Sequence, residues 1–407
     1  MSDSVVIIGA GQAGVQTAFS LRDMGYPGEI TLINGEKFLP YQRPPLSKSY
    51  LKNTITDDNL LFRNEQLYED KKIKIIQGSI ATKINRHPKS VSLSTGINLP
   101  YKKLVLAMGA RNRILPIDGA GLKNVFQLRN LDDAKQLRIE LRKKAKIAII
   151  GGGFIGLEFA SVAKELGAQV SIIESASRVM ARAVCAEISN YVQRTHLAKG
   201  VEILLERKII AIDRNADLAT GLRMQDGSRL SCDLILVSIG VTPNFELAEA
   251  AGLCVDNGVQ VDATLRTSDP DIFAIGDCAC FPSEFSNQRV RLESVQNAVD
   301  HAKTVAENIC GTSKKYQSVP WFWSDQSGLK IQIAGLTSNP ETTVISGDPA
   351  TGKFSVCCFS NGQFIGVESI NQPADHMAAR KLLASGRKIS VSEISRPGAT
   401  LKSLAHS

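Results

Sequence analysis

Val5-Val6-Ile7-Ile8-Gly9-Ala10-Gly11-Gln12-Ala13-Gly14 is the stretch that decides the fold of this 407-residue chain. Its four leading apolar residues predict a buried strand, and the apolar residues that continue to Met24 predict a helix that stops at Gly25. Residues 30–33 predict the next strand. A Gly-x-Gly-x-x-Gly turn between a strand and a helix is the fingerprint of a dinucleotide-binding unit. Its glycines let the backbone approach a pyrophosphate at the helix N-terminus.

The same arrangement recurs later in the chain. Residues 147–150 predict a strand, Gly151-Gly152-Gly153-Phe154-Ile155-Gly156 a turn, and the following residues a helix that ends at Gly167. A second strand at residues 170–173 ends at Glu174. One such turn is a weak signal, because any glycine-rich turn can imitate it. Two turns in this context favour two dinucleotide sites, one for a permanently bound flavin and one for a nicotinamide that binds in each turnover.

Further strands and a third region follow from the pattern. Residues 104–109, 234–240 and 272–277 predict strands that end at glycines or at an acid. From about residue 316 short alternating segments, separated by turns such as Asn361-Gly362, precede a helix predicted near residues 373–385. This pattern predicts a small α+β domain. The last twenty or so residues are polar and basic, which predicts a partly disordered tail.

Composition narrows the class of protein. With 43% hydrophobic and 22% charged residues, the chain is typical of a soluble globular protein of two or three domains. No run is long enough to span a membrane, and the first strand begins too early for a signal peptide, so we expect a cytoplasmic protein. The eight cysteines show no CxxC or zinc-ribbon spacing and the five histidines are scattered, so we expect buried thiols and no metal site. The net charge of +8 suits an acidic partner or an ordinary soluble surface equally.

Five motifs together suggest a family. They are residues 40–48 (Pro-Tyr-Gln-Arg-Pro-Pro-Leu-Ser-Lys), 151–158, 267–270, 276–279 and 320–326. Over about residues 4–370 the chain resembles the NADH-dependent ferredoxin reductases of bacterial oxygenase systems. The resemblance implies an α/β, glutathione-reductase-like fold with two dinucleotide-binding Rossmann-type domains plus a small α+β C-terminal domain. It also implies that FAD, bound non-covalently, passes electrons from NADH to a [2Fe-2S] ferredoxin, which supplies a cytochrome monooxygenase or a ring-hydroxylating dioxygenase.

The resemblance also implies domain bounds and site residues. We expect a discontinuous FAD-binding domain over residues 1–109 and 242–319, an NAD-binding domain over 110–241, and a C-terminal α+β domain over 320–407. The family usually has an acid where Gly35 stands, and here the nearest carboxylate, Glu36, is one place later. The residues expected at FAD are Gly9, Gly11, Ala13, Gly14, Glu36, Arg43, Lys48, Ala81, Arg129, Asp277, Val295 and Trp321. Those expected at the nicotinamide nucleotide are Gly151, Gly153, Ile155, Gly156, Glu174 and Gly240.

Lys48 and Glu158 are the predicted catalytic residues. A lysine near the flavin N5 can stabilise the anionic reduced flavin, and a neighbouring carboxylate would hold that lysine charged and oriented. Taken singly, each residue could equally be an ordinary loop lysine or an acid in the first turn of a helix. Glu174 predicts a preference for NADH, since a carboxylate there accepts from the ribose 2′-hydroxyl and repels a 2′-phosphate. Arg178 is a counter-signal, because its guanidinium could bind that phosphate.

Two other functions were weighed against this one. A disulfide reductase of the same fold needs an early CxxC, but the first cysteine in this chain is Cys185. An apoptosis-inducing-factor-like NADH flavoprotein with a binding or signalling role shares the Pro-Pro-Leu-Ser-Lys segment, and a basic chain could bind nucleic acid. However, the basic residues are spread out, and the densest group is Arg138, Arg142, Lys143, Lys144 and Lys146. We therefore expect an acidic ferredoxin as the partner, and neither nucleic acid nor a membrane.

Overall fold

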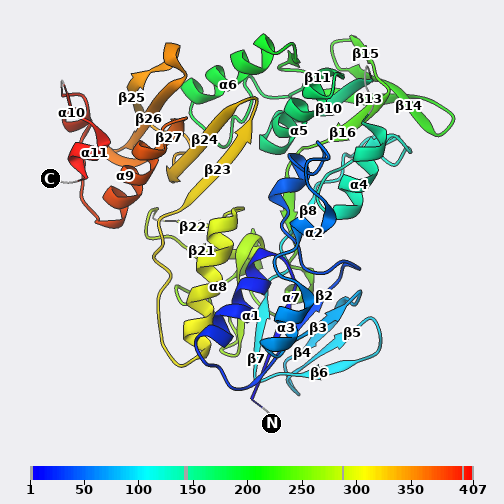
Figure 1. Ribbon diagram of the computed structural model, residues 1–407, viewed down its shortest axis with the longest axis vertical. Helices are drawn as coiled ribbons and strands as arrows, with labels where there is room; N and C mark the ends of the chain where they lie inside the picture. The colour runs from blue at the N-terminus through cyan, green and yellow to red at the C-terminus, as the bar shows by residue number, and fades with distance from the viewer. Residues whose placement is uncertain (1–2, 142–144, 287, 397, 406–407) are drawn as a thin grey trace. The chain divides into compact units, whose positions relative to one another are not determined.

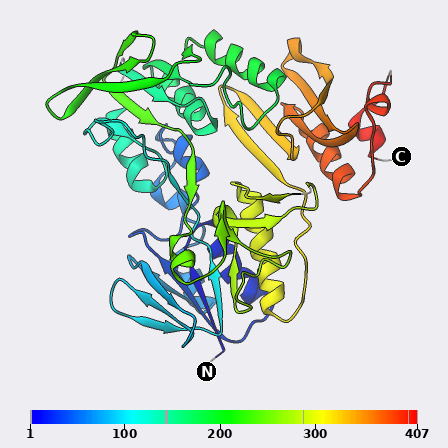
Figure 2. The same ribbon diagram turned by 180° about the vertical axis from the view of Figure 1, so that it is seen from behind.

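The computed structural model describes residues 3–141, 145–286, 288–396 and 398–405 (Figures 1 and 2). Arg142, Lys143 and Lys144 of the basic group therefore lie outside the described residues. The chain forms two compact units, and it passes between them several times. The first unit comprises Met1–Gln42, Asp57–Arg111 and Thr242–Ser318, and the second comprises Arg43–Thr56, Asn112–Val241 and Val319–Ser407.

A parallel five-stranded sheet, in the order β20-β7-β1-β2-β3, is the centre of the first unit. All five residues of β1 are buried, as its continuous apolar run requires of a strand covered on both faces. Helices α1 and α8 pack against each other beside this sheet (Figure 1). The bounds are β1 Ser4–Ile8, β2 Glu29–Asn34, β3 Ile73–Gln77, β7 Lys103–Leu106, β20 Ile272–Ala274, α1 Gln12–Asp23 and α8 Val295–Ile309.

Smaller elements complete the first unit. An antiparallel sheet contains β4 Ala81–Asn85, β5 Ser90–Leu93 and β6 Asn98–Pro100. A four-stranded sheet contains β18 Val255–Asp256, β19 Gly258–Gln260, β21 Ala279–Pro282 and β22 Arg289–Val290. The short helices are α2 Asp57–Leu60, α3 Glu65–Asp70, α7 Glu246–Ala250 and the 3-10 turn η2 Gly276–Cys278. Strands β8 Ala110–Asn112 and β17 Val241–Pro243 lie where the chain passes between the units.

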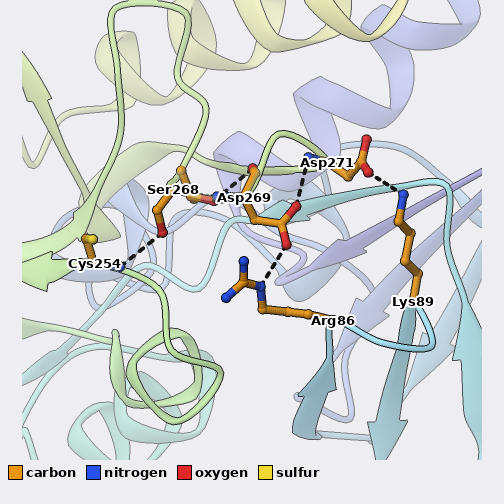
Figure 3. A network of polar contacts seen from close by, with 7 residues as sticks. Arg86, Lys89, Cys254, Ser268, Asp269 and Asp271 are labelled. Atoms are coloured by element: carbon orange, nitrogen blue, oxygen red, sulfur yellow. Dashed lines mark hydrogen bonds and ion pairs between the residues drawn. The ribbon is translucent and has the colours of Figure 1, made fainter.

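The Thr267-Ser268-Asp269-Pro270 motif forms an ion-pair network within the first unit (Figure 3). The Asp269 carboxylate accepts from Arg86 Nε at 2.8 Å and from the backbone N–H of Asp271 at 3.0 Å. Asp271 in turn pairs with Lys89 and Lys103. Burial raises the pKa of Asp271, but the hydrogen bonds from these two lysines outweigh it and lower the pKa below its usual value. The motif therefore fastens the β4–β5 hairpin to the turn that leads into β20.

The second unit contains a second parallel sheet, in the order β12-β11-β10-β16-β9. Its central strand, β10, has four buried residues and is followed directly by the second glycine turn. The strands are β9 Val125–Phe126, β10 Lys146–Ile150, β11 Gln169–Ile173, β12 Glu202–Leu204 and β16 Leu234–Val237. A separate antiparallel sheet contains β13 Ile209–Asn215, β14 Leu218–Met224 and β15 Arg229–Ser231. The helices are η1 Pro44–Ser47, α4 Leu131–Glu140, α5 Phe154–Glu165 and α6 Ala186–Ala198.

The C-terminal part of this unit is an antiparallel sheet, in the order β23-β24-β27-β26-β25, packed against α9. Asn361 and Gly362 both have positive φ and form the tight turn between β26 and β27, as the sequence predicts. The strands are β23 Trp321–Gln326, β24 Leu329–Gly335, β25 Thr342–Asp348, β26 Lys353–Ser360 and β27 Gln363–Ile370. The helices are η3 Pro349–Thr351, α9 Pro373–Ala384, α10 Val391–Ile394 and α11 Leu401–Leu404.

The predicted partial disorder of the tail is wrong for its described residues. Helix α10 begins with a capping box between Ser390 and Glu393, and α11 begins with one between Thr400 and Ser403. Leu401 is buried and belongs to the core beneath α9. The segment is polar on average, but its few apolar residues pack into the core beneath α9 and hold it in place.

Candidate functional site

The first glycine turn forms an open cradle at the N-terminus of α1. Gly9 has a φ of +107°, and a Cβ there would lie 2.2 Å from the carbonyl oxygen of Ala107. A Cβ on Gly14 would lie 1.9 Å from the carbonyl oxygen of Gly9, so the helix can start this close to the strand only with glycine. Gly11 caps the helix without a side chain, and nothing lies within 4 Å of its Cβ position. The first N–H groups of α1 can therefore bind a phosphate.

The second glycine turn has the same geometry at the N-terminus of α5. Gly151 has a φ of +104°, and its Cβ would lie 2.4 Å from the carbonyl oxygen of Ser238. A Cβ on Gly156 would lie 2.3 Å from the carbonyl oxygen of Gly151, whereas the position at Gly153 is open. Gly153 caps α5, again without a side chain, and the neighbouring Ile155 is 42% exposed. Each unit thus contains one cradle that fits a pyrophosphate.

Glu36 lies in the loop after β2, where the adenosine ribose of a bound dinucleotide is expected. Asn34 orders this loop, because its amide accepts from the backbone N–H of Glu36 at 3.1 Å and donates to the carbonyl of Phe38 at 2.7 Å. The hydroxyl of Tyr41 donates to the Glu36 carboxylate at 2.5 Å. Gly35 itself is exposed. A carboxylate is therefore held near the end of β2 although the usual position lacks one.

Glu174 directly follows β11, and its side chain reaches back to the second glycine turn. Its carboxylate accepts from the backbone N–H of Gly152 at 2.8 Å and from that of Ala176 at 2.8 Å. Arg178, the counter-signal, donates to the carbonyls of Ala181 and Val184 at 2.8 and 2.7 Å. The guanidinium therefore holds its own loop together, while the carboxylate lies beside the glycine turn.

The remaining candidates of the first unit are Ala81, Asp277 and Val295, which lie in three different elements. Ala81 is buried at the start of β4, and Val295 is the first residue of α8, after the capping hydroxyl of Ser294. Asp277 lies in η2, and its backbone carbonyl accepts from Arg291 at 3.1 Å.

Within the second unit, Arg43 and Arg129 are neighbours. The guanidinium of Arg43 donates to the carbonyl of Arg129 at 2.8 Å. Asp133 accepts from the backbone N–H of Arg129 and forms a capping box at the start of α4. The structure therefore ties the 43–56 segment to this helix end.

Trp321 and Gly240 complete the candidates of the second unit. The ring of Trp321 lies 5.5 Å from that of Trp323 and 4.7 Å from the guanidinium of Arg380. The indole N–H of Trp321 is buried and makes no hydrogen bond within the described residues. An unpaired buried donor fits a site that a cofactor completes. Gly240 has a φ of +96°.

The structure brings Lys48 and Glu158 together. The ammonium of Lys48 lies 2.8 Å from the Glu158 carboxylate, and the two side chains are 23% and 3% exposed. Two hydroxyls also donate to this carboxylate, Ser47 at 2.5 Å and Ser324 at 2.6 Å. Burying a carboxylate to this degree without such partners would be costly. It can therefore hold the ammonium in one place.

Sequence reasoning assigned no role to Ser47 or Ser324. Both stand inside quoted motifs, Ser47 in the Pro-Pro-Leu-Ser-Lys segment and Ser324 in the Trp-Phe-Trp-Ser-Asp-Gln segment. Because these motifs lie far apart in the chain, only the packing of β23 against α5 shows that they share a carboxylate. The sequence feature that could have indicated a role for them is a serine inside each motif.

Six of the eight cysteines are buried, as expected from the sequence, whereas Cys254 and Cys310 are exposed. Burial raises the pKa of Cys278 to about 11, and Cys280 is 3% exposed. Cys185 and Cys358 meet Glu368 in a buried group whose ligand atoms lie within 4.8 Å of one another, a grouping that the sequence did not predict. The backbone N–H of Cys185 donates to both oxygens of Glu368, at 3.1 and 2.9 Å. In the part of the chain that the structure describes, no helix is long and apolar enough to cross a bilayer.

Two family models together match most of the chain. The family model of the pyridine nucleotide-disulphide oxidoreductases matches residues 3–302, and that of the reductase C-terminal domain matches residues 321–405. Rhodocoxin reductase of Rhodococcus erythropolis is 45% identical over 382 residues, which cover 94% of this chain and 90% of that protein.

Two solved structures are similar over nearly the whole chain. The ferredoxin reductase for the CYP199A2 system from Rhodopseudomonas palustris has a TM-score of 0.96 and 45% identity, and the match covers 99% of this chain and 100% of that one. The covalent putidaredoxin reductase–putidaredoxin complex also gives a TM-score of 0.96, with 35% identity and coverage of 99% and 98%.

Proposed function

Because the chain belongs to the pyridine nucleotide-disulphide oxidoreductase family and ends in a reductase C-terminal domain, we propose that it transfers electrons between NADH and the ferredoxin of an oxygenase system. The chain is a ferredoxin–NAD(+) reductase of glutathione-reductase-like fold that uses FAD and NAD(H). We propose further that this ferredoxin carries a [2Fe-2S] cluster, as the sequence resemblance implies, and that it supplies a cytochrome monooxygenase or a ring-hydroxylating dioxygenase. Similar reductases that serve the CYP199A2 system and an anthranilate 1,2-dioxygenase system support this.

The observation that carries the proposal is the pair of glycine cradles, one in each unit. In each cradle two glycines let the helix start close to the strand, where a Cβ would collide with a backbone oxygen. The N-cap glycine is open, so the first N–H groups of the helix are available to a pyrophosphate. One cradle serves a cofactor that stays bound, and the other serves a nucleotide that exchanges. FAD supplies the chemistry that links a two-electron donor to a one-electron acceptor.

The residues proposed to hold FAD are those that the sequence resemblance assigns to it. In the first unit the cradle would bind the pyrophosphate and Glu36 would accept from the adenosine ribose, with Ala81, Asp277 and Val295 as further contacts. Arg43, Lys48, Arg129 and Trp321 are the other residues that the resemblance assigns to FAD. The unpaired indole N–H of Trp321 supports this assignment, since it needs an acceptor.

We also propose that the second cradle selects NADH. Glu174 is held beside the glycine turn by two backbone N–H groups, which orients its carboxylate for a ribose 2′-hydroxyl. Arg178 already donates to two carbonyls of its own loop, which argues against a role in binding a 2′-phosphate. Gly151, Gly153, Ile155, Gly156 and Gly240 would line the rest of this site.

Lys48 would place a positive charge beside the flavin, and Glu158 would keep it there. The ion pair and the two hydroxyl donors on Glu158 support this division of roles, because they fix the ammonium without neutralising it. Hydride transfer between stacked rings needs proximity rather than a general base. We therefore assign neither residue to proton abstraction from NADH.

The cysteines and the net charge support a compartment and a partner for the chain. All eight cysteines are free thiols, which supports the cytoplasm as the compartment, since disulfides are rare there. The net charge of +8 supports an acidic ferredoxin as the partner. The similarity to electron-transfer reductases favours this reading over the signalling flavoprotein considered from the sequence.

Salt dependence tests the acidic partner. Raising salt from about 10 mM to about 500 mM shortens the screening length from about 30 Å to about 4 Å. We expect ferredoxin reduction to slow about tenfold or more through a higher KM, because electrostatic steering sets the rate of such encounters. NADH oxidation by a small neutral quinone is the control and should barely change. Equal loss of both activities, or loss of neither, would contradict steering by charge.

A further inference from the structure

A chain of buried hydrogen bonds starts at the Glu158 carboxylate and ends at the imidazole of His196 in α6. Ser324 Oγ donates to Glu158 Oε1 at 2.6 Å, and Gln326 Nε2 donates to Ser324 Oγ at 3.0 Å. Gln326 Oε1 lies 3.0 Å from His196 Nε2. Ser324 and Gln326 are two residues apart in β23, so both point to the same face of the strand. Ser324 and His196 are completely buried and Gln326 is 4% exposed, so the chain is shielded from water.

The negative charge of the Glu158 carboxylate determines which group donates in each of these hydrogen bonds. An ionised carboxylate can only accept, so the Ser324 hydroxyl must donate to it and must itself accept from Gln326. Gln326 therefore presents its NH2 group to Ser324 and its carbonyl oxygen to His196. His196 must then carry its proton on Nε2, which leaves Nδ1 as the acceptor that faces Ser327 Oγ at 3.4 Å. Burial lowers the pKa of His196, which favours this neutral ring.

The turn after β23 and the 43–56 segment both make polar contacts with the face of α5 that carries Glu158. The backbone N–H of Ser327 donates to Ser161 Oγ at 2.8 Å, and Ser161 Oγ lies 3.4 Å from a carboxylate oxygen of Glu165. The other oxygen of Glu165 lies 2.5 Å from the ammonium of Lys52. These α5 residues share one helix face with Glu158, since they follow it at three and seven positions. Polar contacts therefore join β23, α5 and the 43–56 segment at two places, around Glu158 and around Ser161 and Glu165.

We propose that Gln326 and His196 are positioning residues for Glu158 and, through it, for the Lys48 ammonium. The inference rests on the proposed function, in which that ammonium faces the flavin. Both act through Ser324, Gln326 directly and His196 by way of Gln326. Without the amide donor of Gln326, the Ser324 hydroxyl can turn away from Glu158 Oε1, and the carboxylate can rotate away from Lys48. A displacement of about 1 Å at a reacting site can cost about a hundredfold in rate.

Substitutions of Gln326 in the FAD-bound protein test this. Gln326→Glu keeps the size of the side chain but replaces its NH2 donor with a carboxylate oxygen. The single proton of the Ser324 hydroxyl can then be donated either to Glu158 or to the new carboxylate, but not to both. Gln326→Met removes the amide altogether. The matched control is Gln332→Met, which removes another buried glutamine, from the adjacent strand β24. For each protein we would record the visible absorption spectrum of bound FAD and the rate of flavin reduction against NADH concentration.

We expect both Gln326 variants to lower the limiting rate of flavin reduction about tenfold or more, since the ammonium is displaced. Their flavin absorption bands should shift, while the NADH concentration for half-maximal rate stays within about twofold, because the nucleotide cradle is untouched. Gln332→Met should leave the spectrum and the rate at parental values. His196→Gln retains an N–H donor and should keep most of the rate, whereas His196→Leu should match Gln326→Met.

Parental spectra and rates in both Gln326→Glu and His196→Leu would overturn the inference and leave the network a purely structural role. If the Gln326 variants fail to hold FAD, the two His196 variants decide, and equal rates for them would also overturn it. Failure of the proposed function is a separate result. In that case the parent protein itself, with FAD bound, would not be reduced by NADH.

Discussion

The ammonium of Lys48 lies 2.8 Å from the carboxylate of Glu158, although one residue follows a short 3-10 turn and the other lies in the first turns of α5. The carboxylate is 3% exposed and accepts from two serine hydroxyls as well. A buried charge with three donors has one favourable orientation, so the ammonium it holds is also fixed.

Glu158→Gln should therefore slow the reduction of bound FAD by NADH about tenfold or more, because the neutral amide holds the ammonium less firmly. Lys48→Met should have at least the same effect. Rapid mixing of each FAD-bound variant with NADH measures the rate directly. Lys123 is exposed and forms an ion pair with exposed Asp217, so Lys123→Met provides a control that should react like the parent. Parental rates in both site variants would remove the pair from the mechanism.

The two glycine positions at the N-terminus of α1 should respond differently to alanine. Gly14→Ala places a Cβ 1.9 Å from a backbone oxygen, so we expect a lower Tm and no bound FAD. Gly11→Ala meets nothing within 4 Å, so the FAD-free fold should keep its Tm while the Kd for FAD rises about tenfold or more, because the methyl group occupies the cradle. Thermal unfolding and flavin titration measure both. Unchanged FAD affinity in Gly11→Ala would place the pyrophosphate elsewhere.

The choice of nucleotide should depend on Glu174. Glu174→Ala removes the acceptor for the ribose 2′-hydroxyl and the repulsion of a 2′-phosphate, so the ratio of kcat/KM for NADH to that for NADPH should fall about tenfold or more. Arg178 is left in place in this variant, because it holds the loop. A parent protein that already prefers NADPH would reverse the assignment of Glu174.

No cysteine should take part in turnover. Burial raises the pKa of Cys278 to about 11, so little of this thiol is ionised near neutral pH. The double variant Cys278→Ala, Cys280→Ala should retain NADH-driven reduction of an artificial acceptor within a few-fold of the parent. A loss of about a thousandfold with FAD still bound would indicate a redox thiol and a disulfide-type mechanism.

Local sequence predicted the parts of the fold that local physics decides. Gly9 and Gly151 need positive φ, and strands β1 and β10 are buried on both faces, so both dinucleotide units could be recognised. The Asn361-Gly362 turn was predicted for the same reason. The ordered tail was missed, because Leu401 docks through a contact that composition does not reveal.

The site was predictable only where a motif named the residue. Lys48 and Glu158 stand in recognisable motifs, so their pairing could be expected. The hydrogen bonds through Gln326 and His196 could not, since they join segments that meet only when β23 packs against α5 and Gln326 reaches His196 of α6. The hydrogen bonds from the backbone N–H of Cys185 to Glu368 could not be predicted for the same reason.

The most direct test of the central claim is the number of ferredoxin molecules reduced for each NADH consumed. A catalytic amount of the FAD-bound protein is mixed without oxygen with a limiting amount of NADH and an excess of an acidic [2Fe-2S] ferredoxin. The absorbance of the nucleotide and that of the cluster are followed together. Because NADH delivers two electrons and the cluster accepts one, the account predicts two ferredoxins reduced per NADH. A ferredoxin that stays oxidised while NADH reduces the bound flavin would contradict it.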